Sequence, residues 1–160
     1  MFRLAWDPGA AGGADLRLDV GDSRLESNSY YFAINRDDRG DESSGDRTRR
    51  VLGTMLEQWR TAVEKCPAGG VAFLPFDLQD EHTGWVRCSV GESCTLEFGT
   101  APVEGYKIWP NDWQKWKGSV PAFQVRSDVP PLRMSREDVL AAIDASRLEL
   151  AEPPPLSDRL

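Results

Sequence analysis

The chain has 160 residues, of which 40% are hydrophobic and 28% are charged, values that are ordinary for a globular protein. Its formal net charge is −7, which argues against nucleic acids and anionic membranes as ligands, because both bind surfaces rich in Lys and Arg. We find no apolar stretch of about 18 residues that predicts a membrane span, and no signal peptide. The three cysteines form no Cys-x-x-Cys pair, so we expect reduced thiols, a cytoplasmic location, and neither a metal nor a cofactor.

The first part of the chain predicts an antiparallel meander of short strands. Phe2–Trp6 is a candidate strand, and Asp15–Val20 alternates apolar with charged side chains, as a half-buried strand does. A two-residue Gly-Asp turn then returns the chain along Ser23–Leu25. Ser29–Asn35 carries apolar side chains on both faces, so we predict a more central strand there.

A long amphipathic helix is predicted over Asp46–Cys66, with Asp46 as its N-cap and Pro67 ending it. Gly53 lies inside this helix and costs about 1 kcal/mol relative to alanine, so packing must stabilise it. The apolar residues recur at steps of three and four and define one buried face: Leu52, Met55, Leu56, Trp59, Val63 and Cys66.

Beyond the helix, the pattern returns to strands. Gly70–Phe76 is a continuous apolar run, which predicts a buried strand, and Gly84–Val90 and Cys94–Phe98 alternate as a hairpin, with Trp85 half-buried. A three-residue turn places the apolar members of that hairpin on one face. The predicted pairs are Val90 with Cys94, Cys88 with Leu96, and Val86 with Phe98. Further candidate strands are Val103–Ile108 and Ala122–Arg126.

A second helix is predicted near the C-terminus. Ser135 is its N-cap, Glu137 and Asp138 lie in its first turn, and the helix frays near Leu148. Together these elements predict one α+β domain over residues 1–150, mainly antiparallel sheet, with the long helix packed on one face. A proline-rich tail follows over residues 151–160.

Three tryptophans lie close together in the sequence: Trp109, Trp113 and Trp116. Tryptophan is enriched at interface hot spots and in ligand clefts, so these residues are candidate binding residues. They also fit a simpler interpretation, in which they anchor a short helix to the core. The sequence leaves both interpretations open.

Charged residues gather before and within the first turn of the long helix. Four acids, Asp37, Asp38, Asp41 and Glu42, suit either solubility or the steering of a basic partner. Three arginines follow at Arg47, Arg49 and Arg50, where the helix dipole favours anions instead. The arginines therefore either pair with the neighbouring acids or form a site for an anion or an acidic partner.

The loop Asp77–His82 holds the single histidine beside carboxylates. Such a set suits divalent-metal binding or acid–base chemistry, but its spacing matches no metal-ligand pattern. The chain also lacks the phosphate-loop, Gly-x-Ser-x-Gly and His-Glu-x-x-His motifs. A solvated connection between strands is the simpler interpretation, and the sequence does not favour an enzyme.

We therefore expect a non-enzymatic, acidic protein-binding module, in which the acidic loops steer a basic partner and the tryptophans anchor it. In general profile, small and acidic, the chain resembles bacterial immunity proteins that neutralise toxins, a resemblance that implies occlusion of a basic partner. The alternative is a small-molecule-binding domain or enzyme that uses a cleft formed by Trp109, Trp113 and Trp116 together with the Asp77–His82 loop. The oligomeric state is left open.

Overall fold

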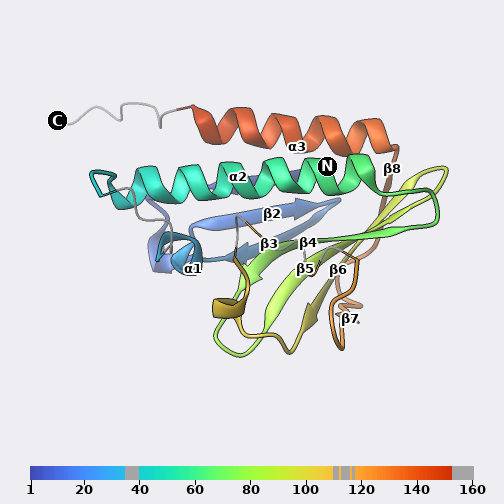
Figure 1. Ribbon diagram of the computed structural model, residues 1–160, viewed down its shortest axis with the longest axis horizontal. Coiled ribbons are helices and arrows are strands. Elements are labelled where there is room, and N and C mark those ends of the chain that lie inside the picture. Colours follow the sequence, from blue (N-terminus) through green and yellow to red (C-terminus); the bar gives the residue numbers. More distant parts are fainter. Residues whose placement is uncertain (35–39, 110–111, 113–115, 117, 153–160) are drawn as a thin grey trace.

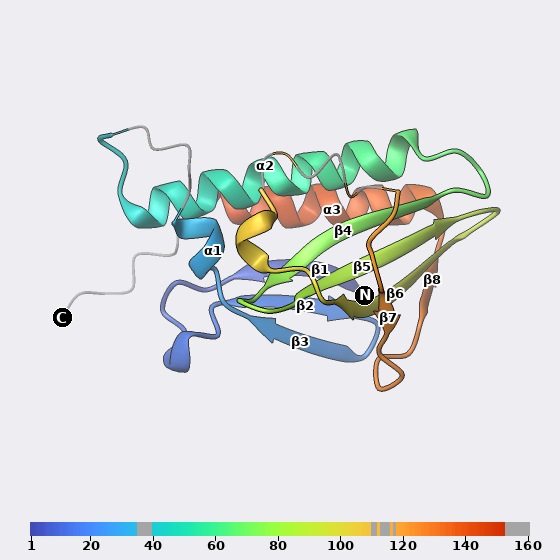
Figure 2. The same cartoon turned by 60° about the horizontal axis from the view of Figure 1, so that its bottom comes forward.

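The structure is a computed structural model that describes residues 1–34, 40–109, 112, 116 and 118–152. In this part of the chain, two antiparallel sheets lie side by side, and two long helices run next to each other along one side of them (Figures 1 and 2). The predicted α+β class, with a long helix and a second helix near the C-terminus, is confirmed. Of the helices described, none has the length and apolarity that a membrane crossing requires.

The first sheet is the predicted meander. Its strands are β1 (Phe2–Trp6), β2 (Leu16–Val20) and β3 (Ser23–Ser27), in the order β1-β2-β3. Leu18 pairs with Leu4 on one side and with Leu25 on the other, so the apolar members share one buried face.

The predicted strand over Ser29–Asn35 is wrong. Tyr30–Ala33 forms a short helix, α1, because polar side chains next to it satisfy the backbone locally: Oδ1 of Asn28 accepts a hydrogen bond from the Tyr30 N–H at 3.1 Å. A helical turn buries Phe32 and turns Tyr30 and Ile34 to the surface, with exposed fractions of 61% and 47%. A strand would have placed all three side chains on one face.

Helix α2 (Ser44–Lys65) begins earlier than predicted, and Asp46 is not its N-cap. The cap is Ser43, whose Oγ accepts a hydrogen bond from the Asp46 N–H at 3.1 Å. The predicted apolar face is buried as expected, and Trp59 stacks on Phe2 of β1 with ring centroids 6.2 Å apart.

The second sheet is built on three long strands: β4 (Val71–Leu78), β5 (Thr83–Val90) and β6 (Cys94–Ala101). The hairpin of β5 and β6 has the predicted register, including the pair Val90 with Cys94. The pairing of β4 with β5 shifts between Pro75 and Asp77, which fits the absence of an N–H on proline.

Two short strands, β7 (Gln124–Val125) and β8 (Leu132–Met134), add to the outer edge of β6. The chain before β7 also covers the second face of this sheet. Phe123 lies over Gly99, the partner of Trp85, and packs edge-on against Phe73 with ring centroids 5.1 Å apart. Trp85 is therefore fully buried rather than half-buried as predicted.

The predicted strand over Val103–Ile108 is also wrong. Gly105–Lys107 forms a 3-10 turn, η2. Its Gly105 N–H donates to the carbonyl oxygen of Gln79 at 2.7 Å, so η2 is attached to the turn between β4 and β5. This attachment brings two surface segments together, η2 and the turn between β4 and β5.

Helix α3 (Arg136–Ala151) has the predicted cap, since Ser135 Oγ accepts from the Asp138 N–H at 3.0 Å. It runs past the predicted end near Leu148. The helix packs along α2 and against β1, and Nε of Arg60 on α2 donates to both carboxylate oxygens of Asp144 at 3.1 Å. The two helices thus form one layer over the first sheet.

Candidate functional site

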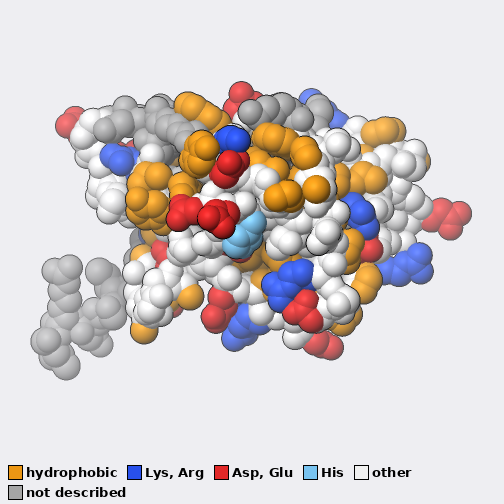
Figure 3. Space-filling model, turned by 90° about the horizontal axis from the view of Figure 1, so that it is seen from below, with side chains coloured by type: hydrophobic (Ala, Val, Ile, Leu, Met, Phe, Trp, Pro, Cys, Tyr) orange, Lys and Arg blue, Asp and Glu red, His pale blue; other side chains and the backbone are white. Residues whose placement is uncertain are grey.

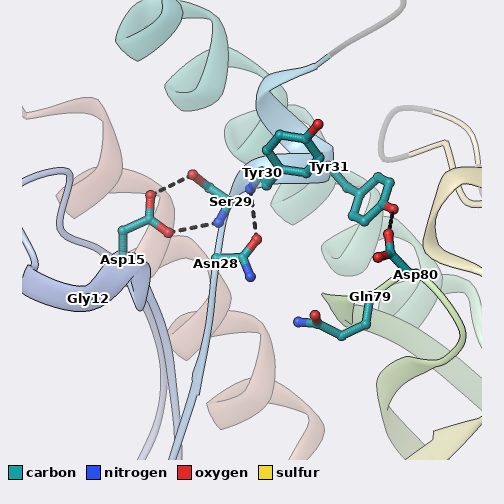
Figure 4. Close-up of a pocket in the computed structure, with 9 residues that line it drawn as sticks. Gly12, Asp15, Asn28, Ser29, Tyr30, Tyr31, Gln79 and Asp80 are labelled. Carbon is teal, nitrogen blue, oxygen red and sulfur yellow. Dashed lines mark hydrogen bonds between the residues drawn. The ribbon is translucent and has the colours of Figure 1, made fainter.

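A groove opens where β3, α1 and the turn between β4 and β5 meet (Figure 4). Its volume is about 520 Å³, within the range of roughly 300–1,000 Å³ that small-ligand sites occupy. We call it the tyrosine groove. The described residues that line it are Gly12, Gly13, Asp15, Asn28, Ser29, Tyr30, Tyr31, Gln79 and Asp80.

One wall of the groove centres on Asp15. Its Oδ1 accepts a hydrogen bond from the Ser29 N–H at 2.7 Å, and its Oδ2 accepts from Ser29 Oγ at 2.6 Å and from Trp6 Nε1 at 3.1 Å. Three donors therefore orient this carboxylate, and two of them come from the residue just before α1. The same bonds anchor α1 beside the groove.

The opposite wall is the turn between β4 and β5. The Gln79 N–H donates to the carbonyl oxygen of His82 at 3.0 Å and closes the turn. Asp77, at the base, accepts from Gln79 Nε2 at 2.6 Å and from Ser27 Oγ at 2.5 Å. Because Ser27 belongs to β3 and Asp77 to β4, this bond ties the two sheets together close in sequence to the lining residues Asn28 and Gln79.

A hydrogen bond from the Tyr31 hydroxyl to Oδ1 of Asp80 joins α1 to this turn (Figure 4). That bond, with smaller contributions from burial and from the Asp80 charge, raises the pKa of Tyr31 above its ordinary value, so the hydroxyl keeps its proton. Tyr30 packs edge-on against Tyr31 with ring centroids 5.3 Å apart. The two tyrosine rings thus lie next to each other, and Tyr31 is bonded to the Asp80 carboxylate.

The charge of the groove is one-sided. Asp15 and Asp80 stand on opposite walls (Figure 4), and none of the described lining residues is Lys, Arg or His. Oδ2 of Asp80 accepts no hydrogen bond from the described residues, and the side chain is exposed. The arrangement favours a cation over an anion.

Exposed aromatic rings continue beyond the groove onto η2. Tyr106 is close enough to Tyr31 to affect its pKa, and Trp109 follows η2 in the chain; their exposed fractions are 49% and 43%. The one cation on η2, Lys107, is paired with Glu104 at 2.7 Å. In Figure 3, hydrophobic side chains gather on this face near acidic ones and the single histidine. We call Tyr30, Tyr106 and Trp109 the aromatic surface.

The tryptophans singled out in the sequence do not share one environment. Trp109 is exposed, whereas Trp116 is half-buried and packs against the core. Trp113 lies outside the described residues, as do Asp37 and Asp38. Neither Trp109 nor Trp116 is among the described residues that line the tyrosine groove.

The arginines of α2 mostly meet nearby acids. Arg50 makes a bidentate pair with Glu42, with Nε–Oε1 and Nη2–Oε2 distances of 2.8 Å. Arg49 lies 3.5 Å from Asp46 and places its guanidinium 5.5 Å from the ring centroid of Trp6. Arg47 is half-buried in the first turn, and Asp41 is exposed. The pairs with Glu42 and Asp46 match the simpler of the two interpretations offered by the sequence.

The Asp77–His82 loop divides between structure and surface. Asp77 links the sheets, whereas Asp80, Glu81 and His82 are exposed. Among the described residues, no three or more His, Cys, Asp or Glu side chains are grouped so that they could hold a metal ion. What the loop contributes to the groove is Gln79 and Asp80.

No sequence motif singled out Asp15, Tyr30 or Tyr31 as site residues. The available signal was the pair Asn28-Ser29, since Asn and Ser before an aromatic run favour a turn over a strand. A turn there would have predicted that Tyr30 and Tyr31 reach the surface. That Asp15 and Asp80 meet the same groove depends on contacts across 14 and 49 residues of sequence.

The fold and the groove define a small α+β domain with an acidic, tyrosine-lined surface site. No protein-family model, no curated protein and no solved structure matches the chain. The chemistry of the groove and of the aromatic surface is therefore what indicates a function.

Proposed function

We propose that this chain is a non-enzymatic, acidic protein-binding module that occludes a basic partner, in the manner of an immunity or inhibitor protein. The observation that carries the proposal is the aromatic surface beside the exposed acids of the β4–β5 turn, Asp80 and Glu81. Exposed aromatic rings supply the buried anchors of protein interfaces, and neighbouring charges of one sign steer an oppositely charged partner. A net charge of −7 acts in the same direction.

The test is capture of a partner from a native lysate at low ionic strength. We expect one stoichiometric partner of basic isoelectric point, released as ionic strength rises from about 0.05 M to about 0.5 M, where charges are screened within about 4 Å. The captured protein should also lose its own activity on mixing at a one-to-one ratio. Repeated failure to recover a partner at low salt would sink the proposal.

Matched variants connect the capture to the surface. The double substitution Tyr30→Ala with Trp109→Ala removes two exposed anchors, so it should reduce recovery at least tenfold. Leu148→Ala is the control, because Leu148 is a 70% exposed hydrophobic residue on α3, outside the aromatic surface. Equal losses from both proteins would show that the aromatic surface is not the interface.

The second candidate function is a small-molecule-binding domain or enzyme. The tyrosine groove supports it through its volume of about 520 Å³ and through Gln79 and Asp80 of the loop that the sequence indicated. A member of a metabolite panel should then raise the melting temperature, and Asp80→Asn, a substitution in the lining of the groove, should reduce the shift. A flat response across the panel removes this candidate.

A further inference from the structure

The tyrosine groove has a more specific chemistry than a general acidic surface. We propose that it receives an arginine side chain projecting from the basic partner, with Asp80 as the ion-pair acceptor and Tyr30 and Tyr31 as the aromatic walls. The inference rests on the proposed function and names what this site would recognise.

Charge and shape both favour a guanidinium group. Asp15 and Asp80 line the groove from opposite sides, and none of its described lining residues is Lys, Arg or His. Tyr31 occupies Oδ1 of Asp80 and so holds the carboxylate in place, while Oδ2 receives no donor from the described residues. A planar guanidinium can donate to that oxygen and stack on an aromatic face, which the compact ammonium of lysine does less well.

The walls are held in place before any ligand arrives. Three hydrogen bonds orient Asp15, and the Ser27–Asp77 bond at 2.5 Å fixes the β4–β5 turn against the first sheet. Tyr30 is the adjustable member, since it is 61% exposed and rests edge-on against Tyr31. A preorganised site of this kind loses little conformational entropy on binding.

The probe for this inference is a blocked arginine amide, titrated into the labelled protein by NMR. We expect a dissociation constant on the order of 10 mM, because one exposed ion pair and one cation–π contact are weak. Amide shifts should map to residues 12–15, 28–31 and 79–80. The blocked citrulline amide has nearly the same shape without the charge, and we expect no saturable binding from it.

Two variants test the assigned roles. Asp80→Asn should weaken binding of the arginine amide about fivefold, which is what an exposed ion pair contributes. Its matched control is Glu92→Gln, which removes the same charge from an exposed hairpin turn at the other end of β5. Tyr30→Ala should weaken binding about twofold to fivefold through the lost cation–π contact, and it carries the test if Asp80→Asn does not fold.

The inference is overturned if citrulline amide binds as well as arginine amide, if Asp80→Asn matches Glu92→Gln, or if the shifts map elsewhere. It is separable from the proposed function. A captured partner whose binding is unaffected by Asp80→Asn leaves the module intact and removes the arginine pocket. If arginine amide binds at the groove but no partner is captured, the arginine pocket stands and the protein-binding module is removed.

Discussion

The hydroxyl of Tyr31 on α1 donates a hydrogen bond to the carboxylate of Asp80 in the β4–β5 turn, across 49 residues of sequence. Tyr31 follows the last strand of the first sheet, and Asp80 follows the first strand of the second. Their contact therefore depends on the packing of the two sheets. It also decides which oxygen of Asp80, Oδ2, receives no donor from the described residues.

The Tyr31–Asp80 bond predicts an unusual titration. The pKa of Tyr31 is raised because the hydrogen bond needs the protonated hydroxyl. One of the three tyrosines should therefore ionise at a higher pH than the other two in a near-ultraviolet titration. Tyr31→Phe should remove that late transition, and Asp80→Asn should move it toward the ordinary value of about 10. If Tyr31→Phe leaves the late transition in place, the bond is not its cause.

The sign of the linked stability effect follows from the raised pKa. The bond is fully formed below the unfolded-state tyrosine pKa of about 10 and is lost as pH rises through the raised folded-state value. Wild type should therefore be more stable than Tyr31→Phe at pH near 8, and the difference should shrink only as pH rises above about 10. Urea unfolding of both proteins at several pH values measures it.

Two glycines should respond oppositely to alanine. A Cβ at Gly53 on α2 would meet only Leu150 at an ordinary 4.0 Å, so Gly53→Ala should raise the free energy of unfolding by about 1 kcal/mol through helix propensity. At Gly99 on β6, a Cβ would lie 2.3 Å from the Gln124 carbonyl oxygen and 2.5 Å from Phe123. Gly99→Ala should therefore lower the free energy of unfolding by about 1–3 kcal/mol.

Urea unfolding of the two variants gives both numbers in the same assay. A destabilised Gly53→Ala would mean that α2 packs more tightly against α3 than the Leu150 contact indicates. A neutral Gly99→Ala would mean that both Phe123 and the backbone at Gln124 move away without loss.

The N-caps of the two long helices should be equivalent in energy. Ser43→Ala and Ser135→Ala each remove one side-chain acceptor from a first-turn N–H, so each should cost about 1 kcal/mol of unfolding free energy. Ser44→Ala, one residue further along α2, is the control and should cost less than about 0.5 kcal/mol. If Ser43→Ala cost nothing and Asp46→Ala cost about 1 kcal/mol, Asp46 rather than Ser43 would be the cap.

The Arg50–Glu42 pair should act on stability and not on partner binding. Both side chains are mostly buried, at 21% and 17% exposed, and the pair is bidentate. A double-mutant cycle with Arg50→Gln and Glu42→Gln should give a coupling free energy of about 1 kcal/mol. Capture of the partner should be unchanged in these variants. A loss of capture in Arg50→Gln alone would show that the interface includes the start of α2.

Local patterns predicted much of the fold because its main elements bury one face with a regular period. The apolar steps of α2 from Leu52 to Val63 and the alternation of β5 with β6 each allow one arrangement that covers the apolar side chains. Segments whose side chains fit two periods were predicted wrongly. In Tyr30–Ala33, the hydrogen bonds that Asn28 and Ser29 accept from the backbone N–H groups of α1 outweighed the aromatic content typical of a strand.

By itself, the sequence determined an acidic α+β domain, the apolar face of α2, the hairpin register and the cap at Ser135, all of which depend on neighbours a few residues apart. Only the tertiary structure decided that Asp15, Tyr31 and Asp80 share one groove, and that Trp116 packs against the core while Trp109 is exposed. The physical reason is that these contacts join segments far apart in the chain, and no local period records which surface segments the packed sheets bring together.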